Sequence, residues 1–471
     1  MPMSKENPNL HFGPRRPAVL GARSWRAGMI AIFLALLISS PLPLLPRGSA
    51  QTGSQGAATT ATTRSAALAA ATGEVLKETS DLRQLAVLRA VQSSTQSRAE
   101  IERAIIKNLD EDTTATDLHA SEQVLKRLGM APPDFQYRAL LVRVLTEQVA
   151  GYYDPKTQQF HLADWIDVDG QKPVMAHELT HALQDQHFNL GRFEHWPKGD
   201  SDAELAAHAL IEGDATLAMV LYVSSNPLRA LAFLKSMALG GTSTDELNKA
   251  PRALRETLLF PYQEGLNWTR SLHKHGGWDE VSAAFKSLPQ STEQILHPEK
   301  FVAREAPVKV TLPDLTKILN GKNSGAKTTS LPAWKKLTSD VNGEWGFYLI
   351  LDQFLKASAE SRAAAAGWAG DRFDLYEDRQ GGTVYLSGSS WDSEADAREF
   401  FDAYVRRVGL RYPDATNQPA AIAAPGQSRV VFQTPDGLTA IERQGMRVTV
   451  TEGVADRDML NSILKAARAV K

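Results

Sequence analysis

The chain has 471 residues, no cysteine, 43% hydrophobic and 23% charged residues, and a formal charge of -2 from 52 basic and 54 acidic side chains. That apolar fraction supplies cores for a globular protein of two or three domains and excludes a disordered chain. The charge balance argues against a nucleic acid as partner, because a polyanion is bound by a basic surface. Without cysteine, disulfides and thiolate metal sites are excluded, so any metal ion needs His, Asp or Glu ligands.

Residues 1–50 have the features of a secretory signal peptide. A basic stretch precedes an apolar run from Ala27 to Ile38, and small residues follow up to Ala50. This order predicts export to the periplasm or the extracellular space, with cleavage after Ala50. The apolar run is shorter than the roughly 20 residues that span a bilayer, which favours cleavage over a retained anchor. We therefore expect contact with a membrane only if this segment is retained.

The segment 51–73 consists almost wholly of Ala, Thr, Ser, Gln and Gly, a composition that predicts a flexible linker. Over 74–149, apolar residues recur at helical spacing and predict four helices. Alternating apolar residues and an Asp-Pro-Lys-Thr turn over 152–162 predict a β-hairpin. We expect these elements to belong to one mainly helical domain, residues 74–308, with the hairpin at its edge.

The most informative segment is His177-Glu178-Leu179-Thr180-His181. On a helix the two histidines lie about 40° apart around the axis and one turn along it, so both imidazoles can reach one ion. In such an arrangement the histidines bind Zn²⁺, and Glu178 takes a proton from the attacking water, whose pKa the ion lowers to about 7. The alternative is a pair of surface histidines, but the apolar residues around the motif favour a buried helix and a metal site.

A catalytic zinc ion needs a third protein ligand and an open position for water. One candidate is His187, but the metzincin pattern that uses a histidine there has a glycine where this chain has Gln184. The other candidate is Glu212, which shares one face of a second predicted helix with Glu204 and His208. An acid–histidine–acid stripe on an apolar helix needs a polar partner. This spacing favours Glu212 over His187.

With Asp185 after it and a glutamate on a later helix, the His177–His181 motif resembles the gluzincin zinc metallopeptidases, of which thermolysin is an example. The stretches 151–155, 212–215 and 291–298 are similar to exported bacterial zincin-like proteins of uncharacterised function. The resemblance implies a zincin-like domain that acts on proteins or peptides. It also implies a role for each matching residue: zinc ligands His177, His181 and Glu212, and general base Glu178.

The resemblance extends to groups around the ligands. Asp185 would accept an N–H from a ligand histidine and fix its tautomer. Asp214 and His208 are expected beside the ligands as well. Zincins commonly pair a peptide with an edge strand before the metal helix, which here would be the 152–162 hairpin. The candidate donors to the oxyanion of the tetrahedral intermediate are Tyr153, His208 and Tyr222.

After residue 298 the pattern changes. Residues 309–340 contain Asn-Gly and Ser-Gly pairs, which are typical of a linker or loop. Residues 341–471 combine helical and strand patterns and predict a small α+β module. Trp368 and Trp391 are candidates for binding a substrate or partner there; the alternative is a module that only packs on the first domain.

Taken together, these patterns predict an α+β protein: an exported zinc-dependent peptidase with a C-terminal module. Two alternatives use the same residues. One is an inactive metal-binding scaffold that acts through its C-terminal module. The other is a zinc amidase that acts on cell-wall material, because the same ligand set can hydrolyse amide bonds outside proteins.

Overall fold

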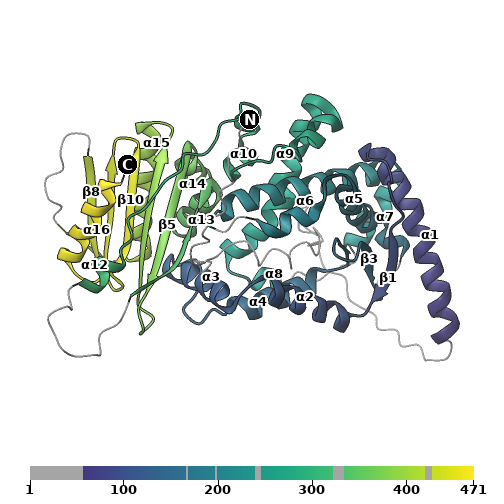
Figure 1. Ribbon diagram of the computed structural model, residues 1–471, viewed down its shortest axis with the longest axis horizontal. Helices are drawn as coiled ribbons and strands as arrows, with labels where there is room; N and C mark the ends of the chain where they lie inside the picture. Colours follow the sequence, from purple (N-terminus) through teal and green to yellow (C-terminus); the bar gives the residue numbers. More distant parts are fainter. Residues whose placement is uncertain are drawn as a thin grey trace, which may run out of the picture.

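The computed structural model describes residues 57–165, 168–196, 199–238, 245–321, 334–418 and 427–470. Over these residues the chain is of the mixed α+β class, as the sequence predicts. Helices and a small sheet form one end of the molecule, and a large sheet with its own helices forms the other (Figure 1).

The first described element is helix α1 (Ala57–Arg83), so residues 57–73, predicted to belong to a flexible linker, are helical. Within that segment, Leu68 and Ala71 are buried in one apolar cluster with Val75 and with residues of α5 and α6. Their spacing gives α1 an apolar stripe, and alanine favours the helix. The linker prediction is wrong here because the Ala/Thr-rich composition hid that stripe. The predicted signal peptide and its cleavage site lie outside the described residues.

A three-stranded sheet lies beside the first helices. Its strands are β1 (Gln92–Gln96), β2 (Gly151–Asp154) and β3 (Gln159–Ala163), in the order β1-β3-β2. The hairpin predicted over 152–162 is confirmed as the antiparallel pair β2–β3, with Gly151 opposite Leu162. Strand β1 pairs with β3 in parallel, which leaves β2 as an edge strand of this sheet.

Most of the remaining elements of this part are helical. Two of the helices begin with capping boxes, Ser97 with Glu100 and Thr114 with Asp117, in which each side chain binds the other residue's backbone N–H. The bounds are α2 Arg98–Asp112, α3 Ala115–Arg127, α4 Tyr137–Gln148, η2 Asp169–Gln171, α5 Lys172–Phe188, η3 Leu190–His195, α6 Ser201–Ser224, α7 Pro227–Ala238, α8 Asp245–Lys249, α9 Arg252–Ala284, α10 Thr292–Leu296 and α11 Pro298–Val302. The next helix in the chain, α12 (Thr316–Asn320), lies against the large sheet instead.

Helices α6 and α9 lie against each other at the centre of the molecule (Figure 1). Their backbones touch at two glycines: a Cβ on Gly213 would lie 2.2 Å from the Gly265 carbonyl oxygen, and a Cβ on Gly265 would lie 2.3 Å from the Ala209 carbonyl oxygen. Any side chain there would push the helices apart. The glycines therefore set the position of Glu212, the neighbour of Gly213 in the chain.

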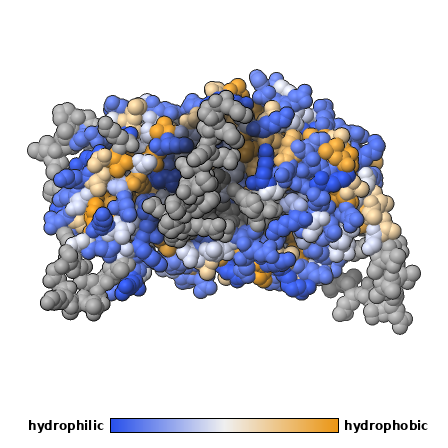
Figure 2. All heavy atoms as spheres, in the orientation of Figure 1, coloured by the Kyte–Doolittle hydropathy of each residue, from blue (hydrophilic) through white to orange (hydrophobic). Residues whose placement is uncertain are grey.

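Among the described residues, Ser201–Ser224 is a helix long and apolar enough to cross a membrane, but 83% of its apolar window is buried inside the protein. It also carries Glu204, His208 and Glu212 along one face. On the face seen in Figure 2, hydrophilic side chains cover most of the described surface. Helix α6 is thus a core helix of this fold.

The C-terminal part is a seven-stranded antiparallel sheet in the order β4-β5-β6-β10-β9-β8-β7. Its strands and helices are β4 Lys335–Asp340, α13 Gly343–Leu355, α14 Ser358–Ala365, β5 Trp368–Glu377, β6 Thr383–Trp391, α15 Glu394–Arg411, β7 Thr416–Gln418, β8 Gln427–Thr434, β9 Gly437–Gln444, β10 Arg447–Val454 and α16 Arg457–Ala469. Trp368 and Trp391 are each 1% exposed and belong to its core, so neither lies on a surface that could bind a partner.

The segment 309–340 is not a free linker where it is described. Strand β4 pairs with β5, and Leu315 and Leu319 at α12 are buried against the same sheet. One apolar cluster also runs through both parts of the protein, from Leu205 of α6 to Phe347 of α13. The turn-forming residues suggested a linker, but the apolar residues between them pack on the sheet and join the two parts.

Candidate metal centre

Helix α5 places the His-Glu-x-x-His motif in the interior. Pro173 lies in its first turn, where a missing N–H costs nothing, and Asn189 ends it in the left-handed conformation. The helix is unbroken at Gln184 and continues to Phe188. All residues from Pro173 to Asp185 are buried.

The side chains of His177, His181 and Glu212 converge between α5 and α6. The Nε2 atoms of the two histidines are 3.2 Å apart, and Oε2 of Glu212 lies 3.1 Å from Nε2 of His177 and 3.4 Å from Nε2 of His181. Two atoms bound at about 2.0–2.1 Å to a tetrahedral Zn²⁺ ion lie about 3.3 Å apart. The three ligand atoms therefore already form one face of a tetrahedron of the size that zinc requires.

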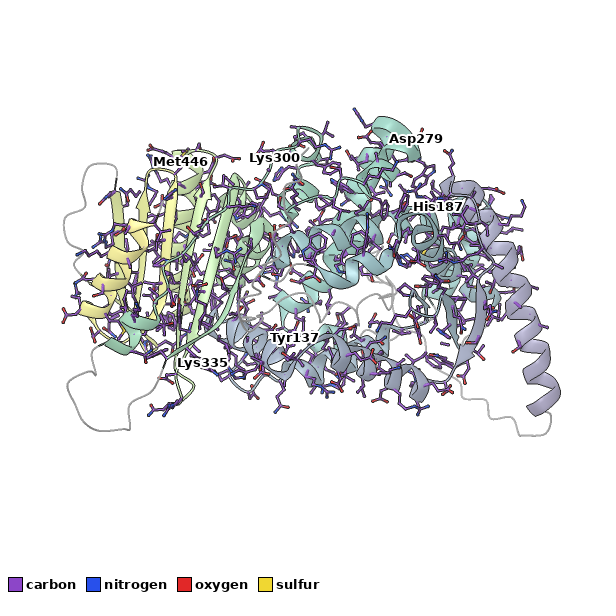
Figure 3. All side chains as sticks on the ribbon, in the orientation of Figure 1. Tyr137, His187, Asp279, Lys300, Lys335 and Met446 are labelled. Carbon is purple, nitrogen blue, oxygen red and sulfur yellow. The ribbon has the colours of Figure 1, made fainter. Side chains whose placement is uncertain are left out.

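His187 does not join this group. Its Nε2 donates to the backbone carbonyl of Ala86, 2.8 Å away, in the segment that follows α1. Figure 3 labels this residue, which lies close to α1. Because α5 is not broken by a glycine, the metzincin geometry is not formed.

The carboxylate of Glu178 is fully buried beside the three ligands. Its Oε2 accepts a hydrogen bond from the backbone N–H of Tyr153, 3.0 Å away, while Oε1 has no hydrogen-bond partner among the described residues. Burial raises the pKa of Glu178 to about 8. A buried carboxylate with one free oxygen can take a proton from water and pass it on, which is the task of a general base.

The negative charge of Glu212 faces the two histidines, and burial and this charge shift the pKa values of all three groups. Burial lowers the pKa of His177, which favours the neutral imidazole that binds a metal. Burial also opposes the charging of His181, but the facing carboxylate of Glu212 outweighs it and raises the pKa of His181 to about 9. Burial likewise opposes ionisation of Glu212, yet the two histidines hold its pKa well below its usual range. A divalent cation would supply the positive charge that a proton supplies here.

The prediction that Asp185 contacts a ligand histidine is wrong. Its carboxylate accepts from the Tyr153 hydroxyl at 2.9 Å, from Arg89 at 2.8 Å and from the backbone N–H of Leu190 at 3.1 Å. These three donors turn Asp185 away from the histidines. The contact to His181 comes instead from Gln184, whose Oε1 lies 2.9 Å from Nδ1 of His181.

Sequence reasoning missed Gln184 and the ring of Tyr262. Gln184 stands three residues after His181, a spacing at which helical side chains meet, and this was the available signal. Tyr262 on α9 stacks on His177 with ring centroids 6.1 Å apart, a contact that nothing in the sequence indicates. Asp214 contacts Gln184 rather than a histidine: its Oδ2 accepts a hydrogen bond from Nε2 of Gln184 at 2.9 Å.

The candidate oxyanion donors are separated by the structure. Tyr222 lies ten residues beyond Glu212 on α6, about 15 Å along the axis, and its ring packs under Arg229. The Tyr222 prediction is therefore wrong. The Tyr153 hydroxyl is held by Asp185, whereas His208 lies one turn from Glu212 on the same face of α6, with Nε2 3.8 Å from Oε1 of Glu204.

A cavity of about 210 Å³ opens near the beginnings of α6 and α9, where the two parts of the protein meet. Leu205 lines it and stands seven residues before Glu212, which is two turns or about 10 Å along the same face of α6. Most of the lining is apolar, from residues such as Leu254, Trp345 and Leu349. A bulky apolar side chain of a ligand would fit this space.

Comparison with known proteins covers only the C-terminal part. A family model described as Domain of unknown function (DUF8575) matches residues 331–464, which include strands β4 to β10. No curated protein matches the chain, and no solved structure does. The metal-centre residues all lie outside the matched region, so their role rests on their own geometry.

Proposed function

We propose that this protein is an exported zinc-dependent peptidase with a zincin-like helical domain, in which His177, His181 and Glu212 hold the ion and Glu178 is the general base. The observation that carries the proposal is the convergence of three buried ligand atoms at the spacing of a tetrahedral zinc ion. Two imidazoles and one carboxylate form the ligand set of hydrolytic zinc sites, which keep a fourth position for water or substrate.

Each residue then has a defined part in hydrolysis. The bound ion would polarise the scissile carbonyl and lower the pKa of water. Glu178 takes the proton from the attacking water through its free Oε1 and delivers it to the leaving amine, while the N–H of Tyr153 keeps its other oxygen in place. We assign the oxyanion donor to His208, which lies one turn from Glu212 on α6 and has its Nε2 3.8 Å from Oε1 of Glu204.

The substrate that fits this site is an extended peptide. Strand β2 is an edge strand that contacts α5, so a peptide could add to it by main-chain hydrogen bonds. The apolar cavity lined by Leu205 lies about 10 Å along α6 from Glu212, which is about three residues of an extended chain. We therefore expect a preference for a bulky apolar residue about three positions from the cleaved bond.

The test is digestion of a broad peptide library by the zinc-loaded protein, with Glu178→Gln as the matched variant. This substitution keeps the size of the side chain and leaves the three ligands unchanged. We expect wild type to cleave, and Glu178→Gln to bind zinc equally but lose at least about a hundredfold in rate. Zinc-loaded wild type that leaves peptides intact while opening cell-wall amide bonds would favour the amidase. If both proteins bind zinc and neither substrate class is cleaved, the inactive scaffold is the better account.

A further inference from the structure

A chain of four buried side chains connects the candidate metal centre to helix α1. Nδ1 of His181 faces Oε1 of Gln184 at 2.9 Å, and Nε2 of Gln184 donates to Oδ2 of Asp214 at 2.9 Å. The other oxygen of Asp214 accepts from Nε of Arg83, at the C-terminal end of α1. Arg83 and Asp214 are both fully buried. The chain thus crosses from α5 to α6 to α1.

The amide of Gln184 has only one orientation that satisfies its neighbours. Its Nε2 faces the backbone carbonyl of Ile211 at 3.0 Å, which can only accept a hydrogen bond, as well as Oδ2 of Asp214 at 2.9 Å. A flipped amide would turn its oxygen toward two acceptors. Oε1 must therefore face His181, so Nδ1 of His181 carries the proton and Nε2 keeps its lone pair for the ion.

Arg83 holds the far end of the chain. Besides Asp214, its guanidinium meets the Ser282 hydroxyl at 3.2 Å and lies 4.3 Å from the ring centre of Trp278. Arg83 and Asp214 form a fully buried salt bridge, and a buried carboxylate without such a partner would be costly. A buried ion pair with defined geometry on both partners also fixes where the Asp214 oxygens point.

From these contacts we propose that Gln184, Asp214 and Arg83 are positioning residues for zinc: a relay that fixes the tautomer and ring orientation of His181. The inference rests on the proposed function, because it assumes that His181 binds the ion. It adds that α1, which carries none of the ligands, contributes Arg83 to the positioning of His181. Partners of this kind typically change metal affinity by about 10–100-fold when they are removed.

The experiment measures the zinc dissociation constant by competition with a chromophoric chelator. Gln184→Glu places a second carboxylate opposite Asp214 and the Ile211 carbonyl, so we expect zinc binding about 10–100-fold weaker. Asp214→Asn alone sets an amide N–H against Gln184 or Arg83, with the same expected loss. In the double variant the two groups exchange roles: the introduced amide donates to the introduced carboxylate, which accepts from His181. We expect this variant to recover part of the wild-type affinity, because the Ile211 carbonyl still faces an oxygen of the introduced carboxylate.

Two controls separate positioning from folding. Thermal unfolding in excess chelator reports whether each variant is folded without zinc, and Lys77→Met removes an exposed cation of α1 and should leave zinc affinity unchanged. Single variants that bind zinc as tightly as wild type would overturn the relay, as would a folded double variant no better than the single ones. If wild type bound no zinc, the proposed function and the relay would both fall; a loss confined to the relay leaves the proposed function standing.

Discussion

The contact between α6 and α9 offers a sharp test of how the metal centre is built. Gly213→Ala would place a Cβ 2.2 Å from the Gly265 carbonyl oxygen, where real contacts are about 1 Å longer, so the two backbones must separate. Overpacking of this kind costs about 1–3 kcal/mol, and the obstacle here is backbone on both sides, which gives little way. We expect the upper part of that range. Because Glu212 is the neighbour of Gly213, the ligand should also move away from His177.

The matched control is Gly73→Ala. Gly73 is an exposed residue of α1, and a Cβ there would meet nothing within 4 Å. The same substitution should therefore stabilise the protein, by about 0.5–1 kcal/mol, because alanine is the better helix former. Urea unfolding in excess chelator measures both free energies of unfolding, and chelator competition measures zinc affinity. Equal stability of Gly213→Ala and wild type would refute the packing on which the centre depends.

Two further substitutions test other parts of the structure. Burial raises the pKa of Asp340 to about 7, above its unfolded value of 3.8. The buried carboxyl therefore does not lower the free energy of unfolding below pH 3.8, and it lowers this free energy progressively as the pH rises from 3.8 to 7. Asp340→Asn keeps an oxygen that can accept from the N–H groups of Ser201 and Val341. We expect urea unfolding to show this variant to be more stable than wild type by about 1–4 kcal/mol at pH 8 but not at pH 4. No gain in stability at pH 8 would contradict the burial argument. Tyr222→Phe should leave peptide hydrolysis within about twofold of wild type, because the hydroxyl has no hydrogen-bond partner among the described residues and Tyr222 stands ten residues, about 15 Å along the axis of α6, from Glu212. A hundredfold loss in kcat/KM would restore Tyr222 to the oxyanion site.

The sequence could predict the cluster of His177, His181 and Glu212 because helical spacing determines which side chains share a face. Residues four apart on α5 must share a face, and the same rule places Glu204, His208 and Glu212 along α6. The hairpin β2–β3 was predictable for a similar reason, since alternation and turn residues specify it locally.

Contacts between residues far apart in the sequence could not be predicted in this way. Nothing in the sequence indicates that Arg83 meets Asp214, 131 positions later, because that contact depends on how α1 and α6 pack. The same holds for Asp185, whose partners are Arg89, in the segment between α1 and β1, and Tyr153 on β2. The amino-acid composition gave a wrong prediction for both predicted linkers. In each, a few apolar residues among many small or polar ones pack against a core.

The most direct test is the zinc content of the purified protein, with its coordination determined by X-ray absorption, for wild type, Glu212→Ala and His187→Ala. The proposed centre predicts about one zinc ion per chain in wild type, bound by two imidazoles and a carboxylate. His187→Ala should keep this ion, because the His187 side chain is hydrogen-bonded to the Ala86 carbonyl, away from the centre. Glu212→Ala should lose it. A wild-type chain without zinc after reconstitution, or zinc that survives in Glu212→Ala and is lost in His187→Ala, would contradict the account.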